Sequence, residues 1–135
     1  MASRWHRRSD LKEQLLFSSS RTFGLWDVLI SHSQVLLRSA KDETDPDSRN
    51  IDLIFSGVFY VQLMTTLRGV EIRQMEQAAA EVVIEEIGGM LYPGNHVFAL
   101  LSGGRRYLVG AAVFRVEEND LHPMMTSLAA PHAAE

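Results

Sequence analysis

The sequence predicts an α+β domain that is built on a mostly antiparallel sheet. Three observations support this class: several runs alternate apolar and polar residues, one run has helical periodicity, and two apolar runs flank a Gly-Gly pair. With 135 residues, the chain has the size of one domain and can bury one core. We therefore expect one helix to pack on the sheet, with a short helix near the N-terminus.

The clearest strand covers residues 51–63. Its odd positions are mostly apolar, and its even positions include Asp52, Ser56, Tyr60 and Gln62. Residues 26–30 and 34–38 also alternate, but the apolar parity changes between them. Such a change predicts a bulge or a tight turn across residues 31–33, because a slip of one residue exchanges the faces of a strand. A shorter alternating run over residues 70–73 predicts another strand.

Two segments are predicted to be helical. In residues 76–88, Gln77, Glu81 and Glu85 recur every four positions, and Gly88-Gly89 provides a stop. Near the N-terminus, Asp10 and Glu13 resemble a capping pair, and leucines 11, 15 and 16 share one helical face. The three serines at 18–20 are expected to end that short helix.

The stretch around Gly103-Gly104 raises the question of a phosphate loop. Glycines that bind phosphate lead into a helix N-terminus, whereas here a strand-like run follows and neither common phosphate-binding pattern is present. Gly-Gly between two strands favours a two-residue hairpin loop. Arg105 and Arg106 would then present positive charge at its tip, where they are candidates for contact with an anion.

The same patterns suggest the domain boundaries. Residues 1–9 form a basic N-terminus that we expect to be flexible, residues 10–122 form the single α+β domain, and residues 123–135 form a loose C-terminal tail. Residues 41–50 gather acids, a proline and turn formers, and they predict an exposed loop.

Composition excludes several functions. There is no cysteine, which excludes a disulfide scaffold, a thiol nucleophile and a cysteine-bound metal. The formal net charge of −4 argues against a general nucleic-acid binder. No apolar run is long enough to cross a bilayer, and charges interrupt any export signal. We expect a soluble cytoplasmic protein without a cofactor.

Some polar residues are candidates for binding a ligand. Asp52, Tyr60, Glu71 and Arg73 occupy outward positions on strands that could be neighbours, and His32 lies at the parity change. A polar pocket is one interpretation, and a solvated sheet face with cross-strand ion pairs is the other. The acidic run at 117–120, followed by a histidine, lacks the ligand spacing of a calcium loop, so no metal site is predicted.

Two functional hypotheses follow. The first is a small non-enzymatic binding or protein-interaction domain that forms a homodimer or binds a protein partner, because no catalytic motif is present and some apolar residues lack an obvious place in the core. The alternative is a small enzyme or ligand-binding domain that uses a polar pocket on the sheet face. The absence of a catalytic motif favours the non-enzymatic hypothesis.

Overall fold

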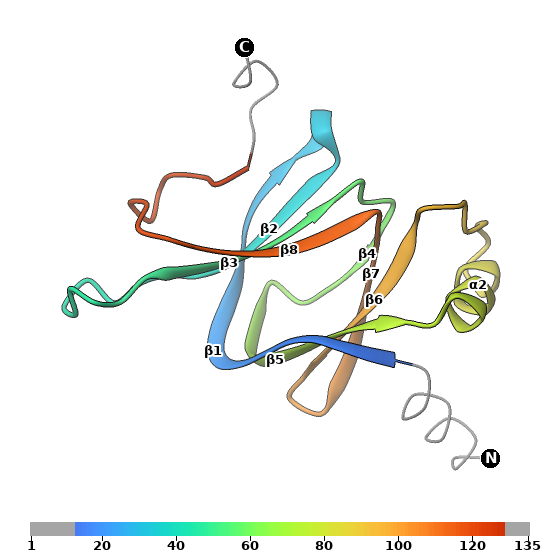
Figure 1. Ribbon diagram of the computed structural model, residues 1–135, viewed down its shortest axis with the longest axis horizontal. Coiled ribbons are helices and arrows are strands. Elements are labelled where there is room, and N and C mark those ends of the chain that lie inside the picture. Colours follow the sequence, from blue (N-terminus) through green and yellow to red (C-terminus); the bar gives the residue numbers. More distant parts are fainter. Residues whose placement is uncertain (1–12, 129–135) are drawn as a thin grey trace.

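The computed structural model describes residues 13–128, in which a closed antiparallel sheet carries one α-helix (Figure 1). This agrees with the predicted α+β class. A 3-10 turn, η1 (Ile30–His32), joins the first two strands, and the helix is α2 (Gln77–Glu86). The strands are β1 (Glu13–Leu29), β2 (Gln34–Ser39), β3 (Asn50–Ser56), β4 (Tyr60–Gln62), β5 (Thr66–Met75), β6 (His96–Ser102), β7 (Arg105–Ala111) and β8 (Val113–Asn119).

The sheet closes on itself because two pairs of strands are continuous. Neighbours pair antiparallel in the order β4-β7-β6-β5-β1-β2-β3-β8. The strand at one end of this order, β4, follows β3 in the chain, and the strand at the other end, β8, follows β7. Backbone hydrogen bonds from Ala112 N–H to Ser56 O and from Phe59 N–H to Gly110 O join the two bends. The strands therefore surround one core.

The bends depend on local irregularity in long strands. β1 pairs with β5 through its first part and with β2 through its last part, and its register shifts between Leu15 and Phe17 and between Ser19 and Thr22. Such shifts bend a strand and increase its twist. At the bend between β3 and β4, Gly57 has a φ of +66°, and a Cβ there would lie 2.9 Å from the Cβ of Ala112. Glycine suits this close approach of two chain segments.

The core combines aliphatic and aromatic side chains from the inner faces of the strands. Phe55, Phe98 and Phe114 contact one another with ring centroids 4.9–5.9 Å apart. Phe23 lies in the same cluster and meets Phe17 edge to face. Because the inward positions come from strands distant in sequence, this core forms only when the sheet closes.

Helix α2 covers part of the outer face of the sheet. Its buried residues Ala80 and Ile84 pack on Met75 and Val97, which lie at the ends of β5 and β6. The helix predicted over residues 76–88 is thus confirmed. The predicted hairpin is also confirmed, with Gly103 and Gly104 at φ values of +58° and +76°.

The prediction of a short N-terminal helix is wrong for those of its residues that the structure describes. Residues 13–16 belong to β1, whereas residues 10–12 lie outside the described residues. The strand also continues through the serines at 18–20, which were expected to break the structure. Nine residues of β1 pair with β5, from Glu13 opposite Met75 to Gly24 opposite Thr66. This ladder of backbone hydrogen bonds outweighs a weak local preference for helix.

The chain after β8 folds back over the outer face of β2 and β3, and we name residues 120–128 the C-terminal segment. Leu128 is buried against Leu36 and Ile54, so these two strands are covered on both faces. Residues 123–128 belong to the stretch that was expected to form a loose tail, and here Leu128 packs on the sheet; residues 129–135 lie outside the described part of the chain.

Candidate functional site

Asp52, the first of the predicted ligand-binding residues, lies in a buried ion pair. The Arg38 guanidinium donates two hydrogen bonds to the Asp52 carboxylate, at 2.7 and 3.0 Å, and both side chains are fully buried. Arg38 also donates to the carbonyl oxygens of Pro123 and Met125, at 3.1 and 2.7 Å. The pair therefore anchors the C-terminal segment to the sheet rather than facing a ligand.

Neighbouring side chains complete this anchor. The Trp26 indole donates to the Pro123 carbonyl at 2.7 Å, and its ring lies beside the Arg38 guanidinium. The Asn50 amide donates to the Leu121 carbonyl at 2.9 Å. Most of these bonds reach backbone carbonyls, which any residue would supply. They hold the path of the segment without requiring particular side chains in it.

The ionisation of Asp52 follows from this environment. Burial by itself raises the pKa of Asp52, but hydrogen bonds from Arg38, Ser127 and Asn119, together with the Arg38 charge, outweigh burial and hold the pKa below its usual range. The Ser127 hydroxyl is buried without a partner at full hydrogen-bond geometry, so we regard Arg38 and Asn119 as the principal donors. Asp52 is thus an anion at neutral pH, with its oxygens already occupied by donors.

The structure does not bring the other predicted residues together with Asp52. Glu71 and Arg73 form a half-exposed ion pair with each other on β5, and β1 and β2 separate this pair from β3. Tyr60 lies on β4, at the end of the strand order. His32 is exposed in η1 and makes a hydrogen bond with the adjacent Ser31. Glu71 and Arg73 lie two positions apart on one strand, so their pair is also not the cross-strand pair of the second interpretation.

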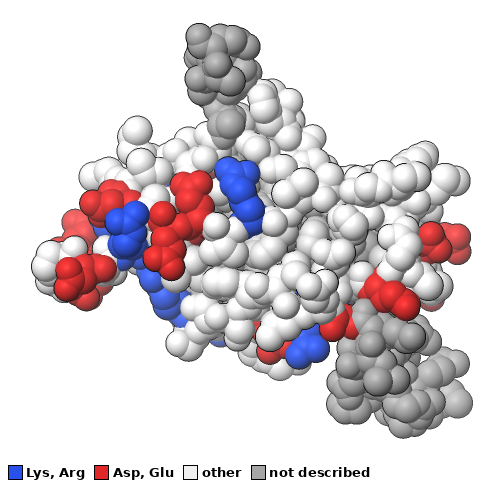
Figure 2. Space-filling view, viewed as in Figure 1, with Lys and Arg blue, Asp and Glu red and all other residues white. Residues whose placement is uncertain are grey.

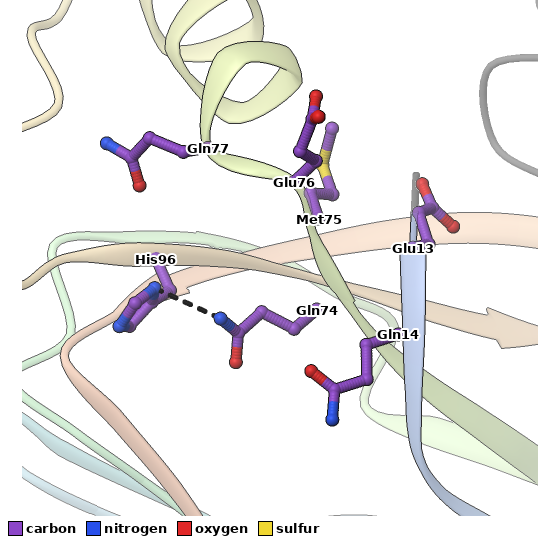
Figure 3. Close-up of a pocket in the computed structure, with 7 residues that line it drawn as sticks. All are labelled: Glu13, Gln14, Gln74, Met75, Glu76, Gln77 and His96. Carbon is purple, nitrogen blue, oxygen red and sulfur yellow. Dashed lines mark hydrogen bonds between the residues drawn. The ribbon is translucent and has the colours of Figure 1, made fainter. Parts of the chain in front are cut away.

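A polar cleft that the sequence patterns did not reveal lies where β1, β5 and β6 meet the start of α2 (Figure 3). Its volume is about 450 Å³. Gln14, Gln74 and His96 extend to one side of the strands in Figure 3, and Glu13 and Met75 extend to the other. The Gln74 amide nitrogen and His96 Nδ1 lie 3.2 Å apart. Amides and an imidazole offer donors and acceptors to a neutral polar molecule.

A second surface feature is an opening into the core between the end of β1 and β4. Leu25, Val28 and Val61 lie directly opposite buried partners in their ladders: Leu37, Val35 and Val109. The partners are only 1%, 5% and 0% exposed, whereas the three residues are 40%, 48% and 47% exposed. Side chains at inward positions are thus open to solvent here. We name these three residues, with the exposed Ile30 and Met64 in the flanking chain segments, the apolar opening.

Two strand edges border the apolar opening. β4 pairs with β7 on one side only, and residues 26–29 of β1 pair with β2 on one side only. Hydrogen bonds close the opening at its two ends, from Leu25 N–H to Thr65 O and from Val58 N–H to Ser33 O. Backbone groups along both edges therefore remain available to another chain, next to apolar side chains.

The distribution of charge sets this region apart. In Figure 2, the charged side chains of the visible face lie mainly at the left, over residues 40–49 and the end of β8, and at the lower right, whereas the upper part over η1 and β2 carries few. The parity change at residues 31–33 was the only sign of this region in the sequence, and it could not show that the flanking strands separate.

Metal and membrane sites are not found in the described part of the chain. Among residues 13–128, no group of three or more histidine, aspartate or glutamate side chains could hold a metal ion. Over the same residues, the one α-helix is too short and too polar to cross a membrane.

Comparison with known proteins adds no assignment: no family model, curated protein or solved structure matches the chain. The function must therefore be inferred from the chemistry of these surfaces.

Proposed function

We propose that this protein is a non-enzymatic protein-interaction domain, and that the apolar opening receives an extended strand from a second copy of the chain. The observation that carries this proposal is the exposure of Leu25, Val28 and Val61, which occupy inward positions of the sheet. Water contacts these side chains at a cost that a partner would remove, since burying apolar surface contributes about 25 cal/mol for each Å².

The backbone supports the same partner chemistry. β4 ends the strand order and can accept an added strand through its unpaired N–H and C=O groups. Two copies of β4 can pair antiparallel about a two-fold axis, which places the same apolar residues on both sides of the contact. Such an interface is self-complementary, and Val61 lies at its centre.

Sedimentation equilibrium across a wide concentration range tests the proposal. We expect the protein to associate into dimers, and we expect Val61→Lys to shift it to monomers, because the substitution places a charge in the contact. Val82→Lys is the matched control, because Val82 is 45% exposed on α2, away from the opening. A protein that stays monomeric at every concentration, or a Val82→Lys variant that dissociates as readily as Val61→Lys, would contradict a dimer through β4.

Hydrogen exchange locates the contact independently. In the dimer, the backbone amides of residues 60–62 and 26–29 should exchange more slowly than in the monomer, since an added strand bonds to an edge that is otherwise exposed to water. Protection confined to other segments would place the interface elsewhere.

A small-ligand-binding domain is the second candidate function, and the polar cleft at Gln74 and His96 is the observation that favours it. Native mass spectrometry of protein purified gently from its own source distinguishes the two. A stoichiometric small-molecule adduct that is lost in His96→Ala would support the ligand-binding function, whereas a dimer without an adduct would support the interaction domain.

A further inference from the structure

We propose that a separate cleft beside the Gly103-Gly104 hairpin binds a small organic anion with an apolar body. The cleft has a volume of about 430 Å³ and lies at the ends of β5, β6 and β7. Arg68, Arg105, Ser102, Tyr107, Met64 and Leu67 are among its lining residues. It differs from the apolar opening in chemistry, although Met64 borders both.

The charge of this cleft is the first argument. Two arginines, Arg68 and Arg105, are among its lining residues, and no aspartate or glutamate is. Within residues 13–128, Arg68 and Arg105 have no side-chain hydrogen bond or ion pair, whereas Arg38, Arg73 and Arg106 are each bound to a carboxylate. Two uncompensated positive charges in a protein of net charge −4 mark a site where an anion would be stabilised.

The sequence had suggested Arg105 and Arg106 together as anion contacts, and the structure separates their environments. Arg106 pairs with the Glu13 carboxylate, whose side chain is nearly buried. Arg105 lines the cleft with Arg68, which lies 37 positions earlier in the chain. Arg68 lies near the start of β5, and Arg105 lies at the start of β7. Because β6 pairs antiparallel with both of these strands, their starts lie at the same edge of the cleft.

The remaining lining residues define the rest of the ligand. Tyr107 is half-buried, and its hydroxyl has no hydrogen-bond partner among the described residues, so it can donate to an anionic oxygen. The exposed Met64 lies beside the nearly buried Leu67 in this lining, and an aliphatic or aromatic body would contact mainly Met64. A guanidinium fork matches both carboxylate and phosphate, so the shared chemistry is an oxyanion head on an apolar body.

Calorimetric titration of the full-length protein with three probes tests this site. Phenyl phosphate and benzoate carry the two possible head groups, and inorganic phosphate has no apolar body. We expect at least one of the two aromatic anions to bind more tightly than inorganic phosphate, because only they have an apolar body that can contact Met64. The preference between the two aromatic probes identifies the head group.

Charge-removing variants assign the binding to this cleft. Arg68→Gln and Arg105→Gln should each weaken binding by about tenfold or more, as expected for the loss of a hydrogen bond to a charged group. Arg115→Gln is the matched control, because Arg115 is an exposed arginine on β8, outside the cleft, and its side chain has no hydrogen bond or ion pair with the described residues. Circular dichroism should show the same fold and melting temperature for all three variants.

Three results would overturn the proposal. The first is the absence of binding by any probe at millimolar concentration. The second is unchanged affinity in both Arg68→Gln and Arg105→Gln. The third is an equal loss in Arg115→Gln, which would indicate a general effect of net charge rather than a site.

Discussion

Replacing Asp52 by asparagine should strongly destabilise the protein, because the buried Arg38 charge would lose its counterion. In the native protein two hydrogen bonds join these side chains, and neither side chain is accessible to water. Removing one partner of a buried ion pair typically costs about 3–5 kcal/mol. The Pro123 and Met125 carbonyls would still accept hydrogen bonds from Arg38, so we expect about 3 kcal/mol, near the lower end of that range.

Urea unfolding followed by tryptophan fluorescence measures this loss. Trp26 contacts Arg38 and the C-terminal segment, and a Trp5→Phe background makes it the only tryptophan. A loss of 3 kcal/mol corresponds to a fall of roughly 10–15 °C in melting temperature for a domain of this size. Asp120→Asn is the control, because Asp120 pairs with Lys41 at the surface, and we expect no resolvable change there.

The difference between the native protein and Asp52→Asn should also depend on pH. The pKa of Asp52 is lowered in the folded state, so its ionisation contributes stability above the pKa of an unfolded aspartate, about 4. This contribution is lost as the pH falls through the lower pKa of the folded state. The difference should therefore be largest near neutral pH and shrink in acid. A difference that is small at pH 7, or that grows in acid, would refute this account of the pair.

Three further substitutions test the packing of the sheet and the C-terminal segment. Trp26→Phe removes the hydrogen bond to Pro123 and should cost about 1 kcal/mol in urea unfolding; an unchanged stability would show that this bond contributes nothing. Gly57→Ala should cost about 1–3 kcal/mol, more than Gly94→Ala, because both have positive φ but only Gly57 would crowd a neighbouring side chain; equal losses would contradict the contact. Ile54→Ala should cost about 2–5 kcal/mol, because Ile54 packs under Leu128, and a loss below 1 kcal/mol would mean that the segment does not cover this site.

Local patterns predicted those parts of the fold that depend on neighbouring residues. The alternation over residues 51–63 follows from the two-residue period of a strand, and the turn at residues 31–33 follows from the change of parity. Helix α2 and the hairpin at Gly103-Gly104 were also predicted, because helical periodicity and turn preferences act over a few positions.

Local sequence patterns did not predict most features of the candidate sites. Asp52 was predicted as a ligand-binding residue, but its partner Arg38 comes from another strand, and the C-terminal segment that covers both comes from the other end of the domain. The short helix predicted near the N-terminus failed for a related reason. Residues 13–16 pair with β5, and that pairing partner lies some 60 positions away in the sequence.

The sequence alone determined the class of the protein: a cysteine-free α+β domain with a modest negative charge, a helix over residues 76–88 and a hairpin at Gly103-Gly104. Only the tertiary structure decided how the strands close, that Arg38 meets Asp52, that Arg68 and Arg105 share a cleft, and that Leu25, Val28 and Val61 remain exposed at inward positions. The physical reason is that strand periodicity gives the face of each residue but not the neighbouring strand. Strand neighbours are chosen by the packing of a whole core, which no local segment contains.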